Sequence, residues 1–302
     1  MEAYGSSTSP MSSPASAIDA GAHARLAELL AAGSLEILPR ELHRAGEVGA
    51  ILPKDTCVYI PSLPGLPLSR TLEAVAAIRA AGLDPVPHVS ARRILDRGEF
   101  RDFLERSVKQ YGVHRVLLIG GDEPKPKGPF QDSVQLLEEG LLAGVGIREL
   151  GVSGYPEGHP RISESDLTSS FQKKVQLARE QGLGIYVVTQ FSFSPARVVE
   201  FCARLARTAP SVMVYVGVAG PTDPIALARY AQRCGVSVSL RALKNLGTGI
   251  AKLVTHTDPG EQLLAVARYS ATRAPSNVAG MHLFSFGGVL RTAAWMRERI
   301  AG

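Results

Sequence analysis

The run Val116-Leu117-Leu118-Ile119, followed directly by Gly120-Gly121-Asp122, carries the pattern that decides the fold. An apolar run without polar alternation predicts a strand that is covered on both faces, as in a parallel sheet. The run Val212-Met213-Val214-Tyr215-Val216 has the same character. Because parallel neighbours need a long crossover, which is usually a helix, we expect a helix between successive strands.

Working outward from these runs, the sequence predicts strands that alternate with amphipathic helices. Strands are expected at 35–38, 57–60, 85–89, 116–119, 150–153, 185–189, 212–216 and 282–286. Helices are expected at 20–32, 69–82 and 100–111, from Ser163 to Gly182, and from Ser194-Pro195 onward. Strand–helix units repeated over about 250 residues predict a closed (β/α)₈ barrel, here with an extra N-terminal helix.

Two alternatives to this arrangement stay open. An open doubly wound sheet is the competing fold, and it is disfavoured because no Gly-x-Gly-x-x-Gly follows the first strand. The stretch 236–240 is either a ninth strand or part of an irregular insertion before the last helix and strand.

Composition restricts the class of protein. The chain has 302 residues, 45% hydrophobic and 20% charged, which is typical of a globular protein. No apolar run approaches the ~20 residues that span a bilayer, so no membrane partner is expected. The net charge of +5 comes from dispersed basic residues, which favours an anionic small ligand over nucleic acid.

Cysteines and termini predict an intracellular single-domain protein. Cys57, Cys202 and Cys234 form no metal-ligand spacing, so they indicate reduced core thiols and no metal site. Residues 1–17 are rich in Ser, Pro and Ala and lack the features of a secretory signal. We therefore expect a disordered tail at 1–17, a single catalytic domain at 18–302 and a cytoplasmic location.

Polar residues cluster where the expected strands end, which in a barrel is the mouth that carries chemistry. Each has a structural alternative. Glu36 could face solvent from its strand or pair with a buried Arg, and Asp122 could cap a turn. The histidines could be loop residues, Gln190 could hydrogen-bond a neighbouring strand end, and the aromatic rings could belong to the core. Five strands that direct polar groups to one mouth nevertheless favour an active site. These residues are Glu36, His88, Asp122, Tyr155, His159, Gln190 and Phe191.

The motifs that contain these residues resemble those of the methylenetetrahydrofolate reductase family. They are Leu35-Glu36-Ile37-Leu38-Pro39, Pro87-His88-Val89, Gly120-Gly121-Asp122-Glu123-Pro124, Gly154-Tyr155-Pro156-Glu157-Gly158-His159-Pro160 and Thr189-Gln190-Phe191. The resemblance extends over about 34–299 and implies a (β/α)₈ barrel that binds FAD. It also implies ping-pong reduction of 5,10-methylenetetrahydrofolate to 5-methyltetrahydrofolate by NAD(P)H, a step of one-carbon metabolism, in a homo-oligomer.

The same resemblance implies roles for individual residues. Glu36 would be the general acid that opens the folate ring, and Asp122 would stabilise the resulting cation. Gln190 and Phe191 would bind the pterin together with Glu36. The flavin would be held by His88, Gly121, Asp122, Tyr155, His159, Asp166 and Lys174.

The chain departs from the family pattern at several places, among them Gly121, where the family usually has Arg, and Tyr59-Ile60-Pro61, where its second strand ends with Thr. The family's first-strand motif has a second proline, whereas Arg40 follows Pro39 here. The family's last strand leads to an Arg that can hold the folate glutamate, whereas Gly287-Gly288 stands here and Arg291 is an unproven substitute. Alternative functions are a flavoprotein that oxidises methyltetrahydrofolate or acts on another one-carbon carrier, and a non-catalytic folate-binding barrel.

Overall fold

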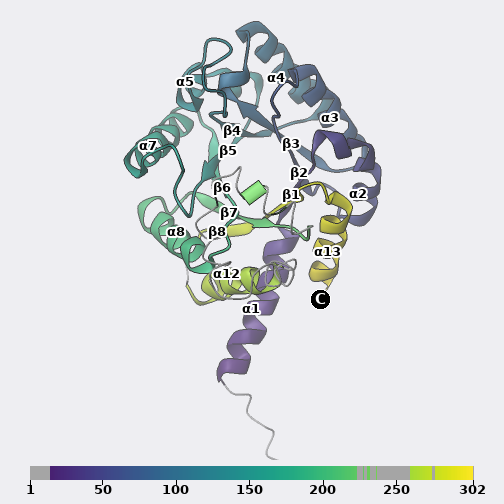
Figure 1. The fold of residues 1–302 in the computed structure, drawn as a ribbon, viewed down its shortest axis with the longest axis vertical. Coiled ribbons are helices and arrows are strands. Elements are labelled where there is room, and N and C mark those ends of the chain that lie inside the picture. Colours follow the sequence, from purple (N-terminus) through teal and green to yellow (C-terminus); the bar gives the residue numbers. More distant parts are fainter. Residues whose placement is uncertain are drawn as a thin grey trace, which may run out of the picture.

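The eight strands of this protein form one closed parallel barrel in chain order, in which β8 pairs with β1 (Figure 1). The computed structural model describes residues 14–222, 227, 230, 231, 236, 259–273 and 276–301. The barrel fold expected from the sequence is confirmed. Of the stretch 236–240, for which a ninth strand and an irregular insertion were both open, only Val236 lies within the described residues, and the remainder lies outside them.

The strands are short and follow one another around the barrel. They are β1 (Ser34–Glu36), β2 (Cys57–Ile60), β3 (Asp84–Ser90), β4 (Arg115–Ile119), β5 (Glu149–Gly154), β6 (Gly184–Thr189), β7 (Met213–Ala219) and β8 (Val278–Phe284). Two boundaries differ clearly from those expected. Strand β1 ends before Leu38 because Pro39 begins a 3₁₀ helix, and β8 starts before His282 because Val278 pairs with Val214 on β7.

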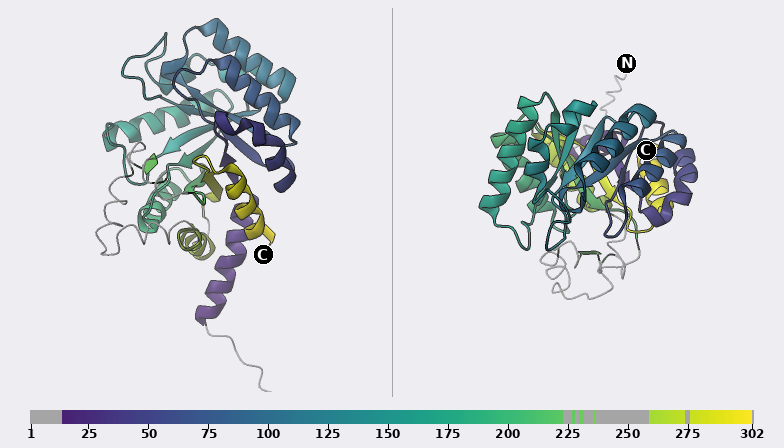
Figure 2. Two further views of the ribbon diagram at one scale, coloured as in Figure 1. Left: turned by 45° about the vertical axis from the view of Figure 1, so that its right-hand side comes forward. Right: turned by 90° about the horizontal axis from the view of Figure 1, so that it is seen from above.

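Helices surround the barrel on its outside (Figure 2). They are α1 (Pro14–Ala31), η1 (Pro39–Arg44), α2 (Ala45–Ile51), α3 (Leu68–Ala80), η2 (Ala91–Arg93), α4 (Arg97–Tyr111), α5 (Ser133–Glu138), α6 (Leu141–Val145), α7 (Glu164–Glu180), α8 (Pro195–Thr208), α12 (Gly260–Thr272) and α13 (Val289–Ala301). The expected N-terminal helix is present, and it begins at Pro14, inside the stretch expected to be a tail. Arg25 attaches α1 to its neighbours, since Nε donates to Ser270 Oγ at 3.0 Å and Nη2 to the Val278 carbonyl at 3.1 Å.

Alternation along each strand divides the core into two layers. On β4, Val116 and Leu118 face outward and pack against the helices, whereas Leu117 faces the barrel axis. The axial layer consists of Tyr59, Val86, Leu117, Tyr186 and Val188. The Tyr59 hydroxyl donates to the Tyr186 hydroxyl at 3.0 Å, so these two buried phenols satisfy each other. This packed layer forms the floor beneath the mouth.

At the opposite end, a buried carboxylate closes the barrel. Asp84 is 5% exposed and pairs with the Arg79 guanidinium at 2.6 Å. Arg115 Nε approaches the same carboxylate at 3.8 Å. In barrels of this kind the carboxyl ends of the strands carry the ligand site, so the mouth opposite Asp84 is the place to search for it.

Two glycine variants test the packing of the floor. At Gly151 a Cβ would lie 2.8 Å from Tyr186 Cζ and 2.9 Å from Leu117 Cδ1, whereas Gly144 in α6 has no atom within 4 Å of that position. We expect Gly151→Ala to lower the free energy of unfolding by about 1–3 kcal/mol through overpacking. Gly144→Ala should raise it by about 0.5–1 kcal/mol because alanine has the higher helix propensity. Denaturant unfolding measures both, and a Gly151→Ala protein as stable as wild type would show that the floor has room.

Candidate active site

Glu36 is the last residue of β1 and faces the barrel axis at the mouth. Its neighbour Leu35 packs outward, so the alternation of the strand turns the Glu36 carboxyl inward. The residue is 8% exposed, and burial raises the pKa of the carboxyl to about 8, with a smaller contribution from the negative charge of Glu41. At neutral pH this carboxyl therefore keeps its proton and can act as an acid.

Glu41 is positioned by the start of the last helix. Its Oε1 accepts the N–H of Val289, the first residue of α13, at 3.0 Å. This hydrogen bond joins η1, which follows β1, to the helix that follows β8. A carboxylate at a helix N-terminus is favoured by the helix dipole, so Glu41 provides a fixed negative charge beside Glu36.

Two histidines lie below the mouth on the barrel axis. The Tyr59 ring stands between them, with its centroid 5.9 Å from that of His88 and 4.6 Å from that of His282. His282 Nδ1 forms a hydrogen bond of 2.9 Å with Ser34 Oγ. Burial lowers the pKa of both imidazoles to about 3, so both are neutral, and neither Nε2 has a partner. On sequence grounds His282 was expected only as a strand residue, although its polar ring inside an apolar strand was a signal.

The turn after β4 contains two carboxylates with opposite environments. Asp122 is 86% exposed and lies 3.6 Å from the Arg161 guanidinium. Glu123 is 10% exposed and pairs with Arg93, whose guanidinium also donates to the Ser62 carbonyl. The Glu123–Arg93 pair therefore joins the chain segments that follow β2, β3 and β4.

The turn at Gly121 packs tightly against side chains beside the Glu123–Arg93 pair. Gly121 has φ of +101°, and a Cβ there would overlap Ser90 Oγ and lie 3.1 Å from Glu123 Oε2. Ser90 Oγ and Glu123 Oε2 are buried and have no hydrogen-bond partner among the described residues. Because buried polar atoms are normally paired, these two atoms are candidates for contact with a ligand.

Aromatic rings form the opposite side of the mouth. Phe191 follows Gln190 after β6 and contacts the rings of Phe284 and Phe286, with centroids 5.7 and 5.1 Å away. Gln190 is held by its own turn, since its Oε1 accepts the Phe191 N–H at 3.0 Å. The Gln190 amide nitrogen makes no hydrogen bond within the described part of the chain, so it can serve as a donor to a ligand.

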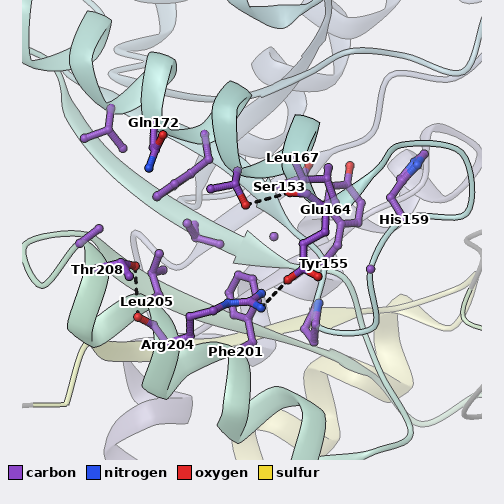
Figure 3. Close-up of a pocket in the computed structure, with 18 of the residues that line it drawn as sticks. Ser153, Tyr155, His159, Glu164, Leu167, Gln172, Phe201, Arg204, Leu205 and Thr208 are labelled. Carbon is purple, nitrogen blue, oxygen red and sulfur yellow. Dashed lines mark hydrogen bonds and ion pairs between the residues drawn. The ribbon is translucent and has the colours of Figure 1, made fainter.

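Tyr155 and His159 line a groove between α7 and α8, outside the strands (Figure 3). Their rings meet edge to face with centroids 5.0 Å apart. The cavity has a volume of about 660 Å³ and an apolar wall that includes Phe171 and Phe201. The Arg204–Glu164 ion pair of 2.7 Å connects α8 to α7 across it.

Asp166 and Lys174, also expected at the cofactor, lie elsewhere on α7. The Asp166 carboxylate is exposed and accepts the Ser163 hydroxyl at 2.6 Å, so it belongs to the helix cap. Lys174 is partly buried, and burial lowers the pKa of its ammonium while the charge of Asp132 near α5 opposes this. Lys174 thus faces α5, whereas Phe171 faces the groove toward α8. The structure brings Glu36, His88, Gly121, Gln190 and Phe191 to the mouth, and it leaves Asp122 exposed in the turn after β4. Tyr155, His159, Asp166 and Lys174 lie around α7.

Two further properties of the described chain bear on function. None of its helices combines the length and apolar character needed to cross a bilayer. The described residues also contain no group of three or more His, Cys, Asp or Glu side chains arranged to hold a metal ion.

Comparison with known proteins identifies the family. Among solved structures, dihydropteroate synthase from Thermus thermophilus matches with a TM-score of 0.50 and 16% identity, covering 89% of this chain and 91% of that one. N-acetylneuraminate lyase from Fusobacterium nucleatum matches with a TM-score of 0.42 and 11% identity, covering 87% of this chain and 68% of that one. The first likeness shows the fold alone. The family model of methylenetetrahydrofolate reductase matches residues 65–266, two thirds of the sequence, and the chain therefore belongs to the methylenetetrahydrofolate reductase family.

Proposed function

We propose that this protein reduces 5,10-methylenetetrahydrofolate to 5-methyltetrahydrofolate, with FAD as cofactor and NAD(P)H as the source of hydride. Membership of the family implies an oxidoreductase that acts on methylenetetrahydrofolate. The observation that carries the assignment to this site is the Glu36 carboxyl, whose pKa of about 8 keeps it protonated at the mouth. A protein that only binds folate has no use for a buried proton donor.

The proton on Glu36 starts the reaction on the substrate. Transfer of this proton to N10 of the folate allows the bond between N10 and the bridging methylene carbon to break. The electron pair of that bond stays on N10, and the methylene group becomes a cationic iminium at N5. Hydride addition to the methylene carbon then gives the methyl group and neutralises the charge. The Glu36 carboxylate left after proton transfer lies in a buried site, where it stabilises the cation electrostatically.

The residues at the mouth fit the ring system of a flavin. Within the described part of the chain, Ser90 Oγ, Glu123 Oε2 and His88 Nε2 are buried atoms without hydrogen-bond partners, and they match the N–H and carbonyl groups on the edge of an isoalloxazine. Gly121 lets Ser90 Oγ and Glu123 Oε2 approach the backbone of the turn, because a Cβ there would overlap them. Lys174 would neutralise phosphate, and Tyr155 and His159 would line the path along α7. FAD, when bound, accepts hydride from the nicotinamide and passes it on to the substrate.

The first prediction separates the two half-reactions with Glu36→Gln. Reduction of bound FAD by NAD(P)H requires no proton donor at Glu36, so its rate should stay within a few-fold of wild type. Reoxidation by methylenetetrahydrofolate should slow by about 10²–10⁴-fold, the usual contribution of a general acid. Stopped-flow absorbance of the flavin follows both steps in one sample. A variant that is reoxidised within a few-fold of the wild-type rate would make Glu36 a structural carboxyl.

The pH dependence of stability offers an independent test of the buried carboxyl. The Glu36 pKa is about 8 in the folded chain against a model value of 4.5, so between these values the folded state holds a proton that the unfolded state releases. Stability therefore falls as pH rises through this window, by about 1.36 kcal/mol per pH unit at most. Glutamine does not titrate, so Glu36→Gln should gain stability over wild type steadily from pH 5 to pH 8. Denaturant unfolding at several pH values measures the difference, and a difference independent of pH would contradict the raised pKa.

A matched pair of variants distinguishes the two carboxylates after β4. The cation-stabilising role is expected at Asp122 from the sequence, whereas the buried carboxylate of this turn is Glu123. A charge acts more strongly where water is excluded, so we expect Glu123→Gln to slow the folate step by at least about tenfold. Asp122→Asn should slow it less than about threefold, because exposed charges are screened. Single-turnover rates with folate decide the matter, and the reverse order would assign the role to Asp122.

A further inference from the structure

The Arg40 guanidinium rests on the loop between β8 and α13. Gly287 in this loop has φ of +92°, and the position that a Cβ would take there is occupied by Arg40 Nη2. Arg40 Cζ and Nε lie 3.5 and 3.8 Å from the same point. Any side chain at position 287 would displace the guanidinium, so Gly287 and Arg40 depend on each other.

The contacts of Arg40 and of its neighbour Glu41 hold η1 in place and leave the Arg40 charge without an ion pair in the described part of the chain. Glu41, the next residue, accepts the Val289 N–H at 3.0 Å, which ties η1 to the first turn of α13. Arg40 Nη2 donates to the Tyr230 hydroxyl at 3.4 Å, and within the described part of the chain Arg40 makes no ion pair. Arg44 on the same 3₁₀ helix differs, because its Nη1 pairs with Glu47 at 2.9 Å. The charge of Arg40 is therefore available to a ligand.

An aromatic surface adjoins this guanidinium. The Tyr230 ring stacks on Phe286, with centroids 4.7 Å apart and an interplanar angle of 25°, and Phe286 in turn stacks on Phe284 at 5.9 Å. Phe286 has φ of +50°, a left-handed conformation that is unfavourable for a residue with a bulky side chain. Such strain persists where the surroundings impose it and is frequent at binding sites. The Phe286 ring is 6% exposed because the rings of Phe191, Tyr230 and Phe284 pack against it. The half-buried Tyr230 ring is therefore the member of this aromatic surface that a ligand beside Arg40 can reach.

We propose that Arg40 binds a carboxylate of the substrate's glutamate, while the aryl group before it lies against the Tyr230 ring. This inference rests on the proposed function, since it assumes a folate whose pterin is at Glu36 and Gln190. The part of a folate beyond the pterin is an aryl amide that ends in a carboxylate. The aryl group suits an aromatic ring, and the carboxylate suits a guanidinium, which binds carboxylates through its fork of N–H donors. Arg40 then replaces the arginine that the family has after its last strand, because it lies over Gly287 in the loop where that arginine is missing.

The test compares a substrate that has the glutamate with one that lacks it. Arg40→Gln should raise KM for methylenetetrahydrofolate by about 5- to 30-fold, because the variant loses one charge-assisted hydrogen bond at a partly exposed site. The kcat should change less than about twofold. The KM for methylenetetrahydropteroate, which has no glutamate, should change less than about twofold. Arg44→Gln is the matched control for a lost positive charge on η1, and Arg291→Gln tests the other arginine near the loop. Calorimetry with 5-methyltetrahydrofolate measures the same loss of affinity without turnover, and the loss should shrink as salt is added.

The outcomes separate this inference from the proposed function. Equal effects of Arg40→Gln on the KM of both substrates would make Arg40 structural and overturn the inference. The inference would also fall if Arg40→Gln changed neither KM, or if Arg291→Gln showed the glutamate-specific loss of affinity. A wild-type protein that binds 5-methyltetrahydrofolate through Arg40 but reduces neither substrate would support the inference and refute the proposed reaction. A wild-type protein that binds no 5-methyltetrahydrofolate would refute both.

Discussion

Loss of water from inside the closed barrel determines the chemistry of the mouth. A carboxyl and two imidazoles lie on the axis, and burial moves the pKa of each toward the neutral form: up to about 8 for Glu36 and down to about 3 for His88 and His282. The same packed layer of tyrosines and aliphatic residues that excludes water supports these groups from below. A proton donor that works near neutral pH follows from this packing and requires no strong partner.

The hydrogen bond between Glu41 and Val289 links the first and last units of the barrel at the point where the ring of strands closes. It puts a negative charge beside Glu36, which adds to the rise of the Glu36 pKa. It also holds η1 against the loop after β8, where Arg40 meets Gly287. One backbone-to-carboxylate contact therefore bears on both the acid and the proposed site for the glutamate of the substrate.

The groove between α7 and α8 shows that size alone does not identify the reactive site. It has about 660 Å³ and mostly apolar walls, yet it lies outside the strands, and its Arg204–Glu164 pair neutralises its own charges. Among the described residues, His88 Nε2, Ser90 Oγ and Glu123 Oε2 at the mouth are buried polar atoms without a hydrogen-bond partner. Buried polar atoms without a hydrogen-bond partner indicate a ligand site more strongly than cavity volume does, because their burial is unfavourable until a ligand forms hydrogen bonds with them.

The sequence by itself determined the barrel, because apolar runs such as 116–119 separated by helical segments are compatible with few other folds. For Glu36 it left open a solvent-facing position and a buried one, and the barrel decided for the buried one because β1 turns this side chain inward. Only the tertiary structure decided which side chains from different strands and helices are neighbours. Sequence could not show that Glu123 turns inward where Asp122 turns out, nor that Lys174 approaches Asp132 near α5 while Phe171 lines the groove toward α8. Nor could it show that Arg40 lies over Gly287, 247 positions later in the chain. Such contacts depend on barrel closure, which brings the ends of the chain together, and no local pattern of residues records them.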